Sequence, residues 1–476
     1  MVRRTYPQRS VFEVLLPDGD QLWDDALREI DAVLDDEAIV DLVDAALRGR
    51  RPKSGSRGRL GTPVVVVLRM LVLKHLYEWS FAECERVVRG SLVYRAFCRI
   101  DCERVPDAKT LIRLAALLGP AVLKNIVERL VHLARERRVV RGHRLRVDTT
   151  VVETNIHYPT DSTLLADGVR VLTRTMRRIC ADAGASGLEV RDRTRSLARR
   201  VFEITQRSRT ATARTGAKVR EHTKARMTEL YREVMAITRT TVRQAETVME
   251  RTTDTVDLGV AALRDQLRET VGLVRRVLAQ TRARVLKGDT HHPDKVLSIF
   301  EPQTEAIRKG KAAKPTEFGK LVKIQEAEAG VVTDYTVCPM RVPDQELWRP
   351  SLTTHQALFG RAPKLAVADG GFASKDNERV ATELGVAHVA LPRPRGRPAP
   401  TAKPPPPRQR WFRRALRWRT GCEGRISVLK RCHGLRRCRY RGLRGMERWV
   451  GFGVIANNLR VLGRAGPRPQ RTSGQR

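Results

Sequence analysis

Three acidic residues, widely separated along the chain, are the side chains best suited to chemistry: Asp148, Asp369 and Glu423. Asp369 ends a short apolar segment, residues 364–371, in which two glycines follow the acid. This pattern is typical of a buried strand that delivers a carboxylate to a turn where backbone or ligand can approach closely. Carboxylate oxygens are hard ligands that suit Mg²⁺. The residue types therefore predict a metal-binding set with Asp369 as its middle member.

Two of these acids also have plain structural explanations. Asp369 can simply cap the next helix, because Asp is a common N-cap residue. The alternation of residues 144–152 predicts a strand with Asp148 in its middle. A carboxylate there is costly unless it is exposed or liganded. An Asp148 exposed at the edge of a sheet is therefore the alternative to a metal ligand.

The third acid, Glu423, lies within a basic segment. On a continuous helix, Arg419, Glu423 and Lys430 would share one face, because offsets of four and seven residues fall close to whole turns. The acid would then lie between two phosphate-binding cations. Thr420 and Glu423 also have the spacing of a capping box, in which Glu423 would bond to the start of its own helix. The residues alone leave these two explanations equally open.

The chain is strongly basic, with 91 Lys and Arg against 53 Asp and Glu in 476 residues, a formal net charge of +38. A protein with this charge associates with polyanions, and nucleic acid is the partner that we expect. The charge is also clustered, since residues 408–448 contain 14 Arg and one Lys against two Glu, with aromatic residues interleaved. Arginine beside aromatic rings suits phosphate binding and base stacking.

Membrane and zinc functions are disfavoured. The longest apolar run, residues 64–73, is about ten residues long and contains Arg69, so it is too short to span a bilayer. No apolar segment follows the basic N-terminus, so we expect no secretory signal. The eight cysteines include no CxxC pair, and Cys432, His433 and Cys438 do not match zinc spacing. We therefore expect reduced thiols in a cytoplasmic protein.

Helical patterns surround the predicted strand that carries Asp148. Residues 1–140 have helical spacing and capped turns, with a capping box at Ser80 and Glu83 and a helix from Leu111 to Arg138. These features fit a helix-turn-helix-like DNA-binding module or a plain helical bundle. Apolar residues spaced by three and four predict a long, coiled-coil-like helical insertion over residues 161–290, arranged as an antiparallel hairpin. Its outer faces mix Arg with Glu, which is typical of a solvated surface.

Strand patterns resume after the insertion. They predict a strand at residues 295–300, a hairpin over residues 320–337, and the short strand that ends at Asp369. A helix over residues 374–384 and a strand over residues 388–391 follow, so the last two strands form a parallel pair. Ligands bind at the carboxyl ends of such strands, where Asp369 lies. The pattern predicts an α/β fold.

These patterns divide the chain into seven parts. They are a helical N-terminal DNA-binding domain (1–140), a first core strand (141–160), a helical insertion (161–290), the rest of the core (291–392), a Pro/Arg-rich linker (393–407), a basic helical part carrying Glu423 (408–465) and a disordered tail (466–476).

The chain resembles the DDE transposases of bacterial insertion sequences along nearly all of its length. Arg419, Glu423 and Lys430 reproduce the R-(3)-E-(6)-K part of the family signature, although Leu416 stands where the family has Tyr. Four further stretches carry the resemblance: GTPVVVVLRMLVLKHLYEWSFAECERVV, RVDTTVVETNIHYPTDSTLLADGVRVL, FEPQTEAIRKGK and VADGGFAS.

The resemblance implies an RNase H-like mixed sheet that carries the catalytic acids, with the helical insertion between its first and second strands. It implies that Asp148, Asp369 and Glu423 hold two Mg²⁺ ions, for which Mn²⁺ can substitute, with no nucleotide cofactor. The expected reaction is metal-dependent cleavage at the ends of the element and transfer of the freed 3′-OH to target DNA. We expect DNA contacts from Arg419, Lys430, Arg425, Arg431 and Trp418.

The expected partners are double-stranded DNA, as the terminal inverted repeats of the element and as target DNA, and further copies of the chain in a homodimer or larger assembly. The expected location is the bacterial cytoplasm, on the nucleoid and not at a membrane. Two alternatives remain: a non-catalytic, basic DNA-binding protein, and a degenerate relative that binds element ends without cutting them.

Overall fold

The computed structural model describes residues 2–6, 23–50, 60–184, 188–210, 217–308, 315–392 and 409–465. The predicted linker and tail lie outside these residues. The chain divides into two compact units, one made of Met1–Thr154 with Ile307–Arg476 and the other of Asn155–Ala306. The N-terminal helices, the basic C-terminal helices and all of the sheet except Glu305 and Ala306 belong to the first unit.

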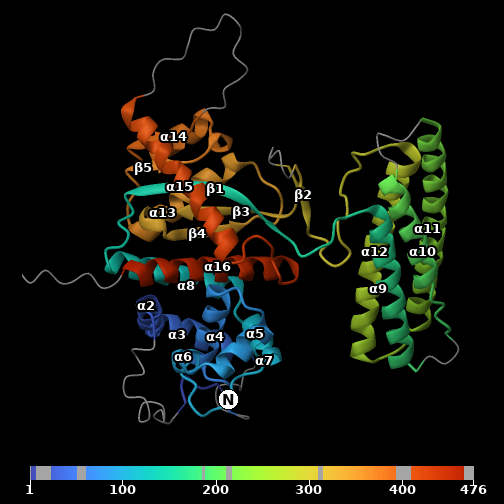
Figure 1. Cartoon of the computed structure of the whole chain (residues 1–476), viewed down its shortest axis with the longest axis horizontal. Coiled ribbons are helices and arrows are strands. Elements are labelled where there is room, and N and C mark those ends of the chain that lie inside the picture. The colour runs from blue at the N-terminus through green and yellow to red at the C-terminus, as the bar shows by residue number, and fades with distance from the viewer. Residues whose placement is uncertain are drawn as a thin grey trace, which may run out of the picture. The chain divides into compact units, whose positions relative to one another are not determined.

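A mixed sheet of six strands organises the first unit (Figure 1). Its strands follow the order β2-β3-β1-β5-β6, and β4 also pairs with β3. The central strand β1 runs antiparallel to β3 and parallel to β5, and β5 runs parallel to β6. The strand bounds are β1 Arg144–Glu153, β2 Glu305–Ile307, β3 Glu317–Glu326, β4 Val332–Val337, β5 Leu365–Val367 and β6 His388–Ala390.

The hairpin and the parallel pair form as the sequence predicts. β3 and β4 are antiparallel, and the turn between them places Ala329 and Gly330 at positive φ, 56° and 83°. After the turn at Gly370 the chain forms α14, which Ser374 caps, and then returns as β6 beside β5. The carboxyl end of β5 is therefore followed by a turn and a helix, which is the setting that we expected for Asp369.

Helices form the rest of the first unit, and polar caps fix several of their starts. Ser80 and Glu83 make the predicted capping box of α5, and Asp107 caps α7. The helix expected to continue from Leu111 is instead broken at Gly119, where Pro120 starts α8. The bounds are α2 Asp25–Leu34, α3 Glu37–Arg48, α4 Val64–Leu76, α5 Phe81–Gly90, α6 Leu92–Phe97, α7 Ala108–Leu117, α8 Pro120–Glu136, α13 Trp348–Phe359, α14 Lys375–Glu383, α15 Arg410–Cys432 and α16 Gly442–Ala465.

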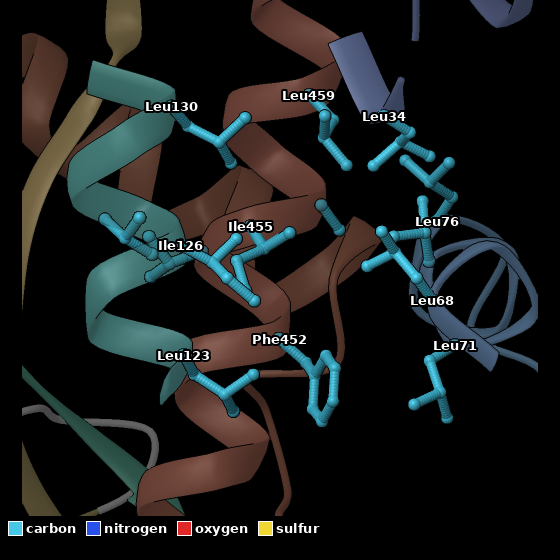
Figure 2. Close-up of a cluster of buried hydrophobic side chains, with 14 of the residues drawn as sticks. Leu34, Leu68, Leu71, Leu76, Leu123, Ile126, Leu130, Phe452, Ile455 and Leu459 are labelled. Carbon is cyan, nitrogen blue, oxygen red and sulfur yellow. The ribbon is translucent and has the colours of Figure 1, made fainter. Parts of the chain in front are cut away.

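The helix α16 joins the N-terminal helices to the sheet. It packs against α2, α4, α8 and β4, and every residue from Trp449 to Leu459 is buried. Figure 2 shows side chains of α16 between those of α8 and α4. The residues drawn there include Phe452, Ile455 and Leu459 of α16, Leu123, Ile126 and Leu130 of α8, and Leu68, Leu71 and Leu76 of α4. One hydrophobic core thus spans the two ends of the chain.

The second unit consists mainly of helices around its own hydrophobic core. We expected a two-helix hairpin, whereas the described residues of this unit form four helices. One reason is that the first long helix ends at Ala183, after which Gly184 has a φ of 60°. The helices are α9 Asp161–Asp182, α10 Thr194–Thr210, α11 Ala217–Arg251 and α12 Leu258–Lys287.

The strand predicted at residues 295–300 is wrong, because this segment is irregular. The side chain of Gln280 on α12 takes the place of a neighbouring strand. Its Oε1 accepts from the Val296 N–H at 2.9 Å, and its Nε2 donates to the Val296 carbonyl at 3.1 Å. The buried Val296 therefore has both of its peptide groups satisfied by one amide side chain.

Among the helices that the structure describes, none alone is long and apolar enough to cross a membrane. Only α7 and α8 taken together pass by length and composition, and they are bent by 82°.

Candidate active site

Asp148 and Asp369 occupy equivalent positions relative to the pairing of the two parallel strands β1 and β5. Arg146 on β1 pairs with Val367 on β5, and each acid lies two residues further along its strand direction. Asp148 is 8% exposed and lies on an interior strand between β3 and β5. The alternative of an Asp148 exposed at the sheet edge is therefore wrong. A buried carboxylate at this position needs a partner or a ligand.

Asp369 does cap the next element, as its structural explanation requires. Its Oδ1 accepts a hydrogen bond of 2.9 Å from the Gly371 N–H, at the start of the short 3-10 helix η4 (Gly370–Phe372). The side chain also lines a cavity of about 550 Å³ that Asp344 and two arginines share. The cap engages one carboxylate oxygen, so capping and ligand binding are compatible at Asp369.

Glu423 lies in the middle of a continuous helix. α15 starts at Arg410, so Thr420 is not at a helix start, and its hydroxyl donates to the Arg417 carbonyl at 2.7 Å. The capping-box explanation is therefore wrong. Arg419 and Glu423 lie on the same face, with 3.2 Å between Nη2 and Oε1, and the Glu423 side chain is 63% exposed.

α15 brings Glu423 to the strands that carry the other two acids. The helix packs on β1 and β5, and it crosses the sheet in Figure 1. Burial raises the pKa of the Cys422 thiol, and the nearby carboxylates of Glu326 and Asp148 raise it further.

The three predicted metal ligands fit Mg²⁺ by chemistry but are not gathered in this conformation. They are all carboxylates, and they lie on elements that pack together. Within the described ranges, however, no three His, Cys, Asp or Glu side chains are close enough together to hold a metal ion. The carboxylate of Glu423 is turned toward Arg419 instead.

Two of the predicted DNA-binding residues line a second cavity together with Glu423. Lys430 and Arg431 belong to the wall of this cavity, which has a volume of about 730 Å³. The Lys430 Nζ lies 3.9 Å from an oxygen of Glu317, and Arg431 is exposed. Both cations are placed where a phosphate next to Glu423 could be bound.

Arg425 and Trp418 make internal contacts. The Arg425 Nη1 donates to Asn457 Oδ1 at 2.8 Å, and its Nε lies 3.5 Å from Glu326 Oε1. The ring of Trp418 packs under the guanidinium of Arg146, at 4.8 Å from ring centroid to Cζ. These contacts hold α15 in place, and DNA binding by Arg425 and Trp418 remains a prediction.

Two features of the site could not be predicted from any pattern in the sequence. A buried ion pair joins Arg146 to Glu326, with 2.8 Å between Nε and Oε2. Asp344 is a fourth acid beside Asp369, and it accepts a hydrogen bond of 3.0 Å from the Thr149 hydroxyl. A motif could not reveal either feature, because the partners are about 180 and 195 residues apart.

Comparisons with known proteins identify both ends of the chain. A family described as Transposase domain (DUF772) matches residues 14–116, and one described as Transposase DDE domain matches residues 407–463. The second match contains Glu423, whereas Asp148 and Asp369 lie outside both matches. No curated protein and no solved structure matches the chain. The two family matches confirm the resemblance to DDE transposases of insertion sequences.

Proposed function

Because this chain carries transposase domains of the DDE type, we propose that it cuts DNA at the ends of an insertion sequence. The freed 3′-OH groups would then be joined to target DNA. The observation that carries the proposal is the parallel register of β1 and β5, which aligns Asp148 with Asp369 beneath the helix that bears Glu423.

The sheet supports an RNase H-like core. Three antiparallel strands, β4, β3 and β1, are followed by two parallel ones, β5 and β6. Asp148 lies on β1, Asp369 follows the end of β5, and Glu423 lies on α15, which packs on both strands. This is the arrangement that the family resemblance implies for the catalytic acids.

The proposed chemistry divides between metal and protein. Two Mg²⁺ ions held by Asp148, Asp369 and Glu423 would supply an activated oxygen nucleophile and stabilise the leaving oxygen. Arg419 and Lys430 would bind phosphates beside the cleaved bond. A phosphate that binds Arg419 competes with Glu423 for the same guanidinium, so DNA binding would free this carboxylate to turn toward the other two acids.

A second candidate function is binding of element ends without cleavage. The observation that favours it is that the described residues hold no gathered set of three metal ligands. The basic surface and both transposase domains would serve such a protein equally well. Because two ends must be cut and joined together, the family resemblance implies a dimer or larger assembly on DNA, and the first proposal includes one.

The Asp369→Asn variant separates these functions. The asparagine Oδ1 can still accept from the Gly371 N–H, so the fold is kept while the charge is removed. The substrate is DNA that carries the inverted repeats flanking the gene, incubated with Mg²⁺ or Mn²⁺. We expect the variant to bind this DNA like the wild type and to lose cleavage by at least 100-fold, the scale of one lost electrostatic contact at a reacting group.

Asp376→Asn is the matched control, since Asp376 is an exposed acid seven residues later that pairs with Arg379. This control should cleave normally. Cleavage by Asp369→Asn at the wild-type rate would refute the three-acid site. A wild-type protein that binds the repeats but never cuts them would establish the binding function instead.

A further inference from the structure

The cavity beside Glu423 extends to the N-terminal helices. Its walls come from α4, β1, α15 and the segment 433–439, and its volume is about 730 Å³. Pockets of this size accommodate small organic ligands, so there is room for one or two phosphodiester groups of a DNA strand. The cavity therefore connects the proposed catalytic helix to a helix that is more than 300 residues away in the chain.

A buried lysine lines this cavity from α4. Lys74 is 3% exposed, and its Nζ lies 4.7 Å from the ring centroid of Phe81, 5.0 Å from that of Trp449 and 5.6 Å from that of Tyr440. Among the described residues the ammonium group has no hydrogen bond and no carboxylate partner. Burial lowers the pKa of Lys74 to about 8.

The ammonium group of Lys74 has aromatic rings around it but no anion beside it among the described residues. A buried ammonium without an anion is costly, and the aromatic cage recovers only part of that cost. An apolar side chain of similar length would fill the same space between the three rings. An anion that enters the cavity would supply the missing partner.

The remaining cations of the cavity leave it with uncompensated positive charge. Arg436 and Arg439 are exposed, and neither makes an ion pair within the part of the chain that is described. The acids on the wall are engaged by other groups: Glu153 lies 3.6 Å from Arg437, Glu317 lies 3.9 Å from Lys430, and Glu78 accepts from the Gly434 N–H at 2.7 Å.

We propose that this cavity binds the phosphodiester backbone of the DNA strand held at Glu423, with Lys74 as the innermost phosphate ligand and Arg436 and Arg439 at its mouth. The position of the strand rests on the proposed function, whereas the phosphate contact does not. Through Lys74, α4 of the N-terminal helices would contact the same DNA strand that lies beside Glu423 on α15.

The test compares Lys74→Met with wild-type protein in binding a labelled DNA duplex, measured by fluorescence anisotropy in EDTA. Methionine keeps the length and the contact with the rings, so stability should be unchanged or higher. We expect binding to weaken roughly tenfold, equally for element ends and unrelated duplexes. The slope of log Kobs against log[salt] should become shallower by about 0.9, as for one lost phosphate contact.

Lys375→Met, on an exposed lysine of α14, is the control and should leave affinity and slope unchanged. The double variant Arg436→Ala with Arg439→Ala provides an independent route if Lys74→Met fails to fold, because both side chains are exposed. The negative slope of log Kobs against log[salt] should become shallower by about 1.8, twice the value for one contact. Wild-type affinity and slope in Lys74→Met, or in the double variant, would overturn the proposal.

Because the assay contains no metal, its outcome is independent of cleavage. If the wild-type protein never cuts DNA but Lys74→Met has the shallower salt slope, the phosphate contact is supported and the proposed cleavage is refuted.

Discussion

Arg146 on β1 donates a hydrogen bond of 2.7 Å from its Nη1 to the carbonyl oxygen of Trp418 on α15. The remaining donors of the same guanidinium bind both carboxylate oxygens of Glu326 on β3. One buried side chain thus connects α15 to two strands. It lies two residues before Asp148 and bonds to a residue five positions before Glu423, so it joins the strand and the helix that carry these two acids.

Arg146→Ala should destabilise the first unit strongly. The substitution leaves Glu326 buried without its main partner, and breaking a buried ion pair in this way costs about 3–5 kcal/mol. The free energy of unfolding, measured by urea denaturation, should fall by that amount. Arg144→Ala is the control, because Arg144 contacts the Trp418 ring only at 5.9 Å, and it should change the unfolding free energy by less than about 1 kcal/mol. Equal stability of the two variants would show that Arg146 does not hold the helix.

Glu423→Gln should abolish cleavage without loss of DNA binding. The substitution removes a proposed metal ligand and also frees Arg419 to bind phosphate, so affinity should be equal or slightly higher. Glu383→Gln is the matched control, since Glu383 on α14 pairs with Arg379 four residues earlier at 3.1 Å. The two pairs have the same helical geometry, so only a role in catalysis should separate the variants. Cleavage assays on element ends provide the measurement, and normal cleavage by Glu423→Gln would contradict the assignment.

Gly371→Ala should reduce cleavage while the protein stays folded. An added Cβ would lie 2.9 Å from Asp344 Oδ2 and 3.1 Å from Asp369 Oδ1, so both carboxylates must shift. Their side chains can rotate, so we expect a loss of stability below about 1 kcal/mol. Gly272→Ala meets no atom within 4 Å on α12 and should raise stability by roughly 0.5–1 kcal/mol at unchanged cleavage. If Gly371→Ala cleaves normally, the position of Asp369 is not critical.

The first unit should lose stability in mild acid through His433. Burial lowers the pKa of this histidine from 6.5 to about 4, and the nearby Arg460 and Arg425 act in the same direction. The unfolded chain binds the proton more tightly, so stability is full above pH 6.5 and falls as pH drops toward 4, by about 3 kcal/mol from this residue. His433→Gln should flatten this part of the pH profile, whereas the exposed His222→Gln should not. Parallel profiles for wild type and His433→Gln would contradict the prediction.

Local signals in the sequence predicted much of the fold. The alternation around Asp148 gave a strand with one acid among apolar neighbours, and Ser80 with Glu83 marked a helix start that the structure contains. The turn at Gly330 was recognisable because glycine adopts positive φ readily, whereas most other residues do not. In each case the pattern and its cause lie within ten residues of each other, so no knowledge of the tertiary structure was needed.

The ambiguity at Glu423 could not be resolved locally. The Thr-x-x-Glu spacing is the same at a helix start and inside a helix. What decides it is the upstream extension of α15, where Trp411 and Ala415 pack against Val367 of β5. The cage around Lys74 and the pair of Arg146 with Glu326 are likewise products of tertiary packing between distant segments.

The placement of α16 has a consequence for synthesis of the protein. The helices α2 to α8 leave the ribosome first, but the side chains that fill the space between α4 and α8 belong to residues 442–465. A growing chain therefore exposes an unfinished apolar surface until α16 has been made. Its N-terminal helices reach their final packing only when the segment bearing Glu423 has also been made, so a truncated chain lacking α16 cannot complete the core around these helices.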